Sequence, residues 1–252
     1  MFKKFLSKIG IGGASVNLVL YHDTVRMGDT ITGELIVQGG DVEQRMNGIT
    51  VELHVKSRYV YNDTTTSVDK CVATVQAATP FTLGVKETKT FPFECQIPKF
   101  IAMSSITTRY YFKTNLDIES ALDSNDRDFL TILPSGLMRN FVEGLDLLGC
   151  KVRGEAFTGS VQILDLRTTH WLVGKLDELV FQFDPAASNQ VMTGHFEIDK
   201  KTSGLYGKMM DKLDLDEVKG YYSFNAIQLE TPGKAADTIQ KFVENHYSRL
   251  LG

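Results

Sequence analysis

The sequence predicts a mainly β protein built as a β-sandwich, and three observations point to that fold class. Apolar and polar residues alternate with period two along many short segments, turn residues separate these segments, and helical periodicity is confined to a few places. With 252 residues, of which 42% are hydrophobic, the chain is long enough to bury one large β domain or two smaller ones.

The clearest alternation lies in the first half of the chain. Residues 49–55 place Ile, Val, Leu and Val at every second position between polar neighbours, as a sheet with one wet face requires. Turn residues bound further predicted strands over residues 16–20, 31–37, 68–75, 81–85, 91–97 and 106–116. Short strands in this order, with almost no helical pattern between them, indicate a β-sandwich.

The three cysteines, Cys71, Cys95 and Cys150, are far apart and form no CxxC pair. They predict neither a disulfide framework nor a zinc knuckle, and a reducing cytoplasm suits them best. Cys71 and Cys95 each share a strand face with apolar residues. We therefore expect both thiols to be small hydrophobic groups of the core.

A change of period marks a domain boundary near the middle of the chain. After Leu133-Pro134, apolar residues that include Phe141 and Leu145 follow helical spacing up to Gly149, with Ser135 placed as a helix cap. The sequence thus predicts a β-sandwich over residues 1–134, a helical linker over residues 135–149 that fixes the orientation of the two halves, and a second β-rich domain over residues 150–252.

The second domain is expected to combine strands with helices. The predicted strands cover residues 150–157, 161–166, 176–183, 191–198 and 218–229, and the predicted helices cover residues 203–213 and the chain end from Thr231-Pro232. Trp171, the only tryptophan, lies in an apolar run and is expected in the core.

The first nine residues predict a short basic amphipathic helix. One side carries Phe2, Phe5, Leu6 and Ile9, and the other carries lysines that include Lys3 and Lys4. Two interpretations stay open: the apolar side packs on the body of the protein, or the helix is a weak anchor to a membrane surface or a partner.

An acidic segment with one embedded arginine follows the strand that ends near residue 116. We expect a loop there that forms a polar network or hinge, made of Asp117, Asp123, Asp126, Arg127 and Asp128. The segment lacks the glycine and the bidentate glutamate of a calcium-binding EF-hand loop. A solvated turn in which Arg127 pairs with neighbouring carboxylates is therefore the favoured interpretation.

Enzyme motifs are missing from the sequence. The five histidines are scattered without an HExxH pair, and the chain has no GxSxG, no phosphate-binding GxxxxGK[ST] and no GxGxxG between a strand and a helix. We therefore predict no catalytic, cofactor-binding or metal-ligating residues. The formal net charge of −4 gives no general reason to bind nucleic acid.

Several segments carry a resemblance to known families. The segment GASVNLVLYHDTVRMGDTITGELIVQGG, followed by Gly48–Leu53, resembles the N-terminal half of arrestin-like proteins. The segments LDIESALDSNDRDFLTIL, KLDELVFQFDP and SGLYGKMMDKLDLDEVKG are similar to the bacterial sporulation-control protein family. The resemblance implies an arrestin-like sandwich joined to a second β-rich domain, in a cytoplasmic regulator or scaffold without catalysis that acts at the earliest stage of sporulation.

Two functions remain to be compared. The first is a non-enzymatic protein that binds protein partners through edge strands or an interdomain groove, with or without self-association. The alternative is a β-sandwich module that binds sugar or calcium. A ligand at 100 times its dissociation constant would stabilise such a module by roughly 2.7 kcal/mol, so a thermal-shift screen separates the two functions.

Overall fold

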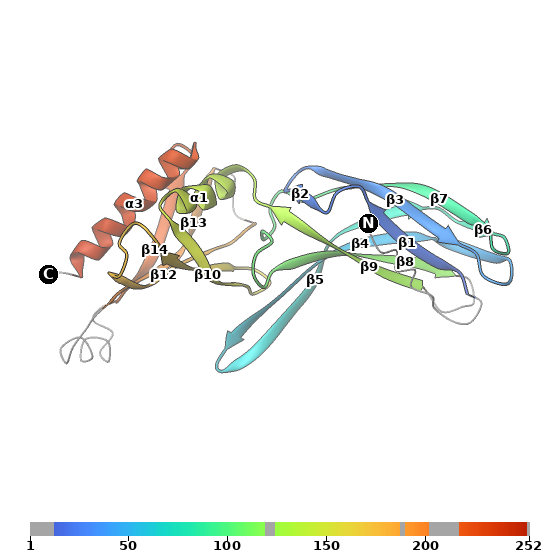
Figure 1. Ribbon diagram of the computed structural model, residues 1–252, viewed down its shortest axis with the longest axis horizontal. Coiled ribbons are helices and arrows are strands. Elements are labelled where there is room, and N and C mark those ends of the chain that lie inside the picture. Colours follow the sequence, from blue (N-terminus) through green and yellow to red (C-terminus); the bar gives the residue numbers. More distant parts are fainter. Residues whose placement is uncertain (1–12, 119–123, 187–189, 202–216, 251–252) are drawn as a thin grey trace. The chain divides into compact units, whose positions relative to one another are not determined.

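The computed structural model describes residues 13–118, 124–186, 190–201 and 217–250 and confirms the predicted mainly β fold (Figure 1). The chain divides into two compact units. The first comprises Met1–Lys56, Ser67–Lys99 and Arg109–Leu133, and the second comprises Ser57–Thr66, Phe100–Thr108 and Pro134–Gly252. Two segments of the predicted first domain are thus grouped with the second unit.

The first unit contains two sheets. The smaller sheet has the order β1-β3-β7, with β1 (Ser15–Leu20), β3 (Thr30–Gln38) and β7 (Thr88–Gln96) all antiparallel. The larger sheet follows the path β2-β9-β8-β4-β5, made of β2 (Thr24–Arg26), β9 (Ser124–Leu133), β8 (Arg109–Ile118), β4 (Gln44–Tyr61) and β5 (Thr64–Ala78), while β6 (Phe81–Leu83) pairs with β4. Only β2 and β9 pair in parallel among these described strands.

The two sheets enclose the core that the alternation predicted. Along β4, Ile49, Val51 and Leu53 are fully buried, and Leu35 and Val37 of the smaller sheet are equally inaccessible. An aromatic pair connects the two sheets. Phe93 of β7 in the smaller sheet and Phe112 of β8 in the larger sheet meet edge to face, with ring centroids 5.3 Å apart. Period-two burial on facing sheets is what makes this unit a sandwich.

The prediction for the thiols is half right. Cys95 is buried, as expected, whereas Cys71 is exposed. The difference follows from the position of β5 at the edge of its sheet. Along β5 only Ala78 is buried, so alternating apolar residues there do not mark a core face.

The predicted acidic loop is shorter than expected. β8 and β9 pair antiparallel as far as Leu116 and Ser124, which places Asp117 in β8 and the segment from Asp126 to Asp128 in β9. Asp123 lies outside the described residues. Pairing of the two backbones therefore continues into a stretch whose charged composition suggested a solvated turn.

The second unit is a five-stranded antiparallel sheet with two described helices. The strands follow in sequence order as β10 (Cys150–Phe157), β11 (Gln162–Thr168), β12 (Leu176–Phe183), β13 (Val191–Lys200) and β14 (Glu217–Asn225). The helices are α1 (Gly136–Leu147) and α3 (Pro232–Arg249). The last predicted strand is shorter than expected and ends at Asn225, and the helix predicted over residues 203–213 lies outside the described residues.

Aromatic side chains join both helices to this sheet. Phe141 of α1 is fully buried and meets Phe181 of β12 and Tyr222 of β14, with ring centroids 5.2 and 6.3 Å away. Phe242 of α3 meets Phe196 of β13 at 4.8 Å. The helix predicted as a linker thus belongs to the core of the second unit, and its role in interdomain orientation stays a prediction.

The helix starts differ from one another. Thr231 caps α3 through its side chain, which accepts a hydrogen bond from the Lys234 backbone amide at 3.2 Å, and Pro232 begins the helix as predicted. Ser135 occupies the cap position of α1 but makes no side-chain cap bond. The predicted cap position is therefore confirmed, but the side-chain bond that usually accompanies it is not formed at Ser135.

Trp171 is not a core residue, contrary to the prediction. It is half-buried, and its indole Nε1 donates a hydrogen bond to Glu244 of α3 at 2.9 Å. The polar indole nitrogen thus finds an exposed carboxylate, as aromatic side chains with a polar end commonly do.

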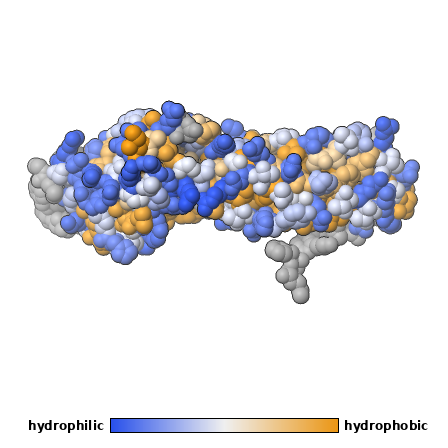
Figure 2. Space-filling view, turned by 90° about the horizontal axis from the view of Figure 1, so that it is seen from above, coloured by the Kyte–Doolittle hydropathy of each residue, from blue (hydrophilic) through white to orange (hydrophobic). Residues whose placement is uncertain are grey.

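The described surface mixes residue types. Figure 2 shows hydrophilic and hydrophobic residues interspersed over the viewed face. Exposed large apolar residues occur in both units, with Val85 in the first and Ile227 in the second as examples. Among the described helices, none combines the length and hydropathy needed to cross a lipid bilayer.

Candidate functional site

Polar side chains gather on the outer face of the larger sheet of the first unit, in a group that we call the His54 cluster. It comprises Glu52 and His54 of β4, Asp69 and Cys71 of β5, and Tyr111 of β8. Successive side chains of a strand point to opposite faces, so residues two apart share one face. Because Ile49, Val51 and Leu53 point into the core, the intervening residues of β4 face outward.

The imidazole of His54 lies between two carboxylates. Its Nδ1 is 2.9 Å from Oδ1 of Asp69, and its Nε2 is 3.3 Å from Oε2 of Glu52. The Tyr111 ring stacks on the imidazole with centroids 5.2 Å apart and an angle of 25° between the planes. These contacts fix both the position and the orientation of the ring.

Asp69 is held by Tyr111 as well as by His54. The phenol of Tyr111 donates to the carboxylate, with distances of 3.0 and 2.9 Å to its two oxygens. Partial burial raises the pKa of Asp69, but the hydrogen bonds from His54 and Tyr111 outweigh it, so the net shift is downward. The pKa of Tyr111 rises, because burial and the bonded Asp69 both favour the neutral phenol.

Glu52 has three donors around one oxygen. Besides the contact with His54, Oε2 accepts a hydrogen bond from Nδ2 of Asn115 at 3.3 Å and another from Nζ of Lys113 at 3.4 Å. Burial raises the pKa of Glu52, yet the bonds from His54, Asn115 and Lys113 prevail and lower it. Glu52 and Asp69 therefore both favour the ionised form.

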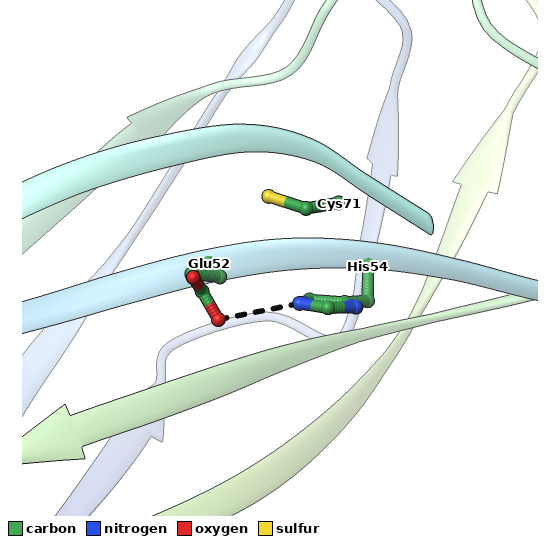
Figure 3. Close-up of side chains that lie close together, drawn as sticks. All are labelled: Glu52, His54 and Cys71. Atoms are coloured by element: carbon green, nitrogen blue, oxygen red, sulfur yellow. Dashed lines mark hydrogen bonds and ion pairs between the residues drawn. The ribbon is translucent and has the colours of Figure 1, made fainter. Parts of the chain in front are cut away.

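Cys71 completes the cluster from the edge strand. One ligand atom each from Glu52, His54 and Cys71 lies within 4.8 Å of the other two (Figure 3). The thiol is exposed, and its Sγ donates to the carbonyl of Ala73 at 3.3 Å. The cluster thus presents an imidazole nitrogen, a carboxylate oxygen and a sulfur side by side, a donor set suited to a transition metal ion.

Cationic side chains border the cluster. The guanidinium of Arg127 lies over the Tyr111 ring at 5.2 Å, and Nζ of Lys56 lies over the Phe129 ring at 4.8 Å. The sequence predicted that Arg127 pairs with the acidic residues around it. Its guanidinium has this ring contact, and its charge also lowers the pKa of the Asp69 carboxyl.

Among the acidic residues predicted to join Arg127, Asp126 accepts a hydrogen bond at its Oδ1 from the Arg127 backbone amide at 2.9 Å. Asp117 accepts a hydrogen bond from Asn47 at 3.1 Å. Asp126 and Asp128 lie on the opposite face of β9 from Arg127, because residues of alternating number point to opposite faces. Burial raises the pKa of Asp126 and, with the charge of Asp126 nearby, raises that of Asp128 to about 7.

The remaining predicted residues do not join this site. Phe141 and Leu145 are buried in the second unit. The predicted anchor, formed by Phe2, Lys3, Lys4, Phe5, Leu6 and Ile9, lies outside the described residues.

Sequence reasoning missed the His54 cluster. It judged the histidines as scattered because it searched for ligands close together in one segment. The usable signal is a pair of two-residue spacings, Glu52-x-His54 and Asp69-x-Cys71, on consecutive strands of a hairpin. Each spacing puts two polar groups on one face, but only the register of the hairpin shows that the two pairs meet.

A buried carboxylate in the second unit was also missed. Glu155 of β10 is 7% exposed and accepts hydrogen bonds from the backbone amides of Thr107 and Thr108 at 2.9 and 3.1 Å. The Gln162 side chain donates to it at 2.9 Å and also donates to the Met103 carbonyl at 2.9 Å. These bonds attach Phe100–Thr108 to the sheet of the same unit, which indicates a structural role.

Comparisons with known proteins agree with this architecture. A family model described as SpoOM protein matches residues 2–202. The sporulation-control protein spo0M of Bacillus subtilis (strain 168) is 22% identical in an alignment 258 residues long, gaps included, that covers 97% of this chain and 98% of that protein. The crystal structure of Spo0M from Bacillus subtilis matches with a TM-score of 0.73 and 20% identity, over 93% of this chain and 99% of that one. The likeness in structure shows a common fold, which is arrestin-like as predicted.

Proposed function

The chain belongs to the SpoOM protein family, and from this premise we propose that it is a non-enzymatic cytoplasmic regulator of sporulation that acts by binding protein partners. The observation that carries the proposal is the match to the sporulation-control protein of Bacillus subtilis over 97% of this chain and 98% of that protein. Both units of the chain take part in a match of this extent. The comparisons lend no support to the sugar or calcium alternative.

The geometry of the His54 cluster supports a role without catalysis. His54 is oriented by Asp69 at 2.9 Å, which is the arrangement of a catalytic base with its orienting carboxylate. The other ring nitrogen, however, is 3.3 Å from the carboxylate of Glu52, which occupies the place of a hydroxyl or thiol nucleophile. A carboxylate in that position has no proton for the imidazole to abstract.

The surface best suited to a partner is the exposed edge of β5. This strand has 15 residues and ends the path of the larger sheet, where β4 is its neighbour. An edge strand presents backbone donors and acceptors to which an extended segment of another chain can pair. Exposed Asp69 and Lys70 supply the charges that keep such an edge from unselective association.

A complementation experiment tests the regulatory role. The gene for this chain is expressed in Bacillus subtilis that lacks its own Spo0M, and spore yield and timing are compared with the strain that carries an empty vector. We expect the chain to move both quantities toward those of the parent strain. Spore counts equal to the empty-vector strain, with the protein present at normal abundance, would contradict the proposal.

Site-specific photo-cross-linking tests the edge strand. A photoreactive amino acid replaces exposed Thr74 of β5 or, as a matched control, exposed Lys241 of α3. We expect discrete cross-linked products in sporulating cells from position 74 and none from position 241. Products from position 241 alone would move the partner surface away from β5, and none from either position would count against partner binding.

A further inference from the structure

We propose that Glu52, His54 and Cys71 form a binding site for Zn²⁺ on the outer face of the larger sheet of the first unit. Their ligand atoms lie within 4.8 Å of one another (Figure 3). Zn²⁺ binds imidazole nitrogen, thiolate sulfur and carboxylate oxygen, and three protein ligands leave its fourth position to water. Mg²⁺ and Ca²⁺ prefer oxygen ligands alone, so sulfur and imidazole in one site favour Zn²⁺.

The distance between two of the ligand atoms already suits a tetrahedral ion. Zn²⁺ lies about 2.0–2.1 Å from nitrogen and oxygen ligands, so two such ligands in tetrahedral geometry are about 3.3 Å apart. Nε2 of His54 and Oε2 of Glu52 are 3.3 Å apart. Zn–S bonds are about 2.3 Å long, which puts a tetrahedral sulfur about 3.5 Å from the other two ligand atoms. The sulfur therefore has to approach from within 4.8 Å by at most about 1.3 Å. A rotation of the exposed Cys71 side chain away from the Ala73 carbonyl supplies this movement.

The groups behind the ligands match those of zinc sites. A metal-bound histidine usually donates its other ring N–H to a carboxylate, which fixes the ring and makes it a better ligand. Asp69 lies 2.9 Å from Nδ1 of His54 and is itself held by the Tyr111 phenol. Nδ1 is thus engaged with Asp69, and Nε2 faces Glu52 and is directed to the metal.

Lys113 competes with the metal ion for Glu52. Its ammonium lies 3.4 Å from the oxygen that also contacts His54. Zn²⁺ must displace this ion pair in order to bind the Glu52 carboxylate. Removal of the lysine charge should therefore strengthen binding, an effect that a merely structural cluster would not show.

The experiment titrates the full, untagged chain with Zn²⁺ after treatment with a chelator, in competition with a chromophoric zinc indicator. We expect one bound ion per chain. Cobalt as a substitute for zinc should produce the near-ultraviolet absorption of a thiolate-bound ion. Cys71→Ala should abolish this absorption, and His54→Gln should abolish stoichiometric binding of Zn²⁺.

Three further variants make the assignment specific. Asp69→Asn should weaken binding by about 10–100-fold, the usual effect of removing the partner of a ligating histidine. Lys113→Met should tighten binding severalfold, and Thr65→Ser, an exposed change on the same strand as Cys71, should have no effect. Circular dichroism confirms that each variant is folded. The proposal would be overturned if the native chain and Cys71→Ala bound Zn²⁺ with equal affinity. It would also be overturned if the native chain bound no more Zn²⁺ than Cys71→Ala does.

Discussion

Asp128 shows how burial changes the chemistry of a single residue. One of its oxygens, Oδ2, is inaccessible and has no hydrogen-bond partner among the described residues. Burial, with the charge of Asp126 nearby, raises its pKa to about 7, whereas an unfolded chain releases this proton near pH ~3.9. Between these values the folded chain binds more protons than the unfolded chain, so the free energy of unfolding falls as pH rises.

We predict that Asp128→Asn removes this pH dependence. The native chain should lose up to about 1.4 kcal/mol of stability per pH unit through this group between pH ~4 and ~7, and the variant should be more stable by roughly 1–4 kcal/mol above pH ~7. Denaturant unfolding of both proteins across this range measures the difference. Exposed Asp117→Asn is the control, and parallel profiles for Asp128→Asn and the native chain would contradict the prediction.

At the scale of the element, the two described helices begin with different degrees of support. The Thr231 side chain accepts the Lys234 amide at the start of α3, whereas Ser135 makes no such bond at the start of α1. We expect Thr231→Ala to lower the free energy of unfolding by about 0.5–2 kcal/mol and Ser135→Ala to change it by less than about 0.5 kcal/mol. Denaturant unfolding measures both, and equal effects would refute the distinction.

The Glu155 network is a second feature at this scale. Glu155→Ala leaves the buried amides of Thr107 and Thr108 without their acceptor, which should cost about 2–4 kcal/mol of unfolding free energy. The segment Phe100–Thr108 should then exchange its amide hydrogens faster, as hydrogen-exchange mass spectrometry detects. Exposed Glu43→Ala is the matched control. Unchanged exchange in this segment would show that the carboxylate does not hold it.

At the scale of the whole molecule, the division into two units predicts that damage to one leaves the other intact. Phe141→Ala removes a fully buried ring from the second unit and should destabilise that unit by about 3–5 kcal/mol. Trp171 fluorescence and alkylation of Cys150 report on this unit, and alkylation of Cys95 reports on the first. Burial raises the pKa of Cys95 to about 11 and that of Cys150 to about 12, so both react slowly until unfolding.

We expect the variant to lose Trp171 fluorescence and Cys150 protection at lower denaturant concentration, while Cys95 keeps its protection. Exposed Leu147→Ala on the same helix serves as the control and should change neither reporter. Simultaneous loss of protection at Cys95 and Cys150 would mean that the units unfold as one, which two-state behaviour of the whole chain requires.

Local features of the sequence predicted most of the elements. The alternation of apolar and polar residues over residues 49–55 predicted β4. A strand with one buried face shows this alternation in its own sequence, whatever the rest of the chain does. The Thr231-Pro232 pair predicted the start of α3 for the same reason. Cys71 was misjudged, since a strand position can be exposed at a sheet edge. Ser135 takes its predicted cap position without the side-chain bond.

Local patterns in the sequence were thus enough to predict the mainly β fold and most of its described strands and helices, because periodicity and turn chemistry act between residues that are close along the chain. The meeting of Glu52, His54, Asp69 and Cys71, in contrast, is visible in the folded chain alone. His54 and Asp69 are 15 positions apart, and Lys113 is 61 positions from Glu52. Their proximity depends on strand order and register, which are set by the packing of the whole sandwich.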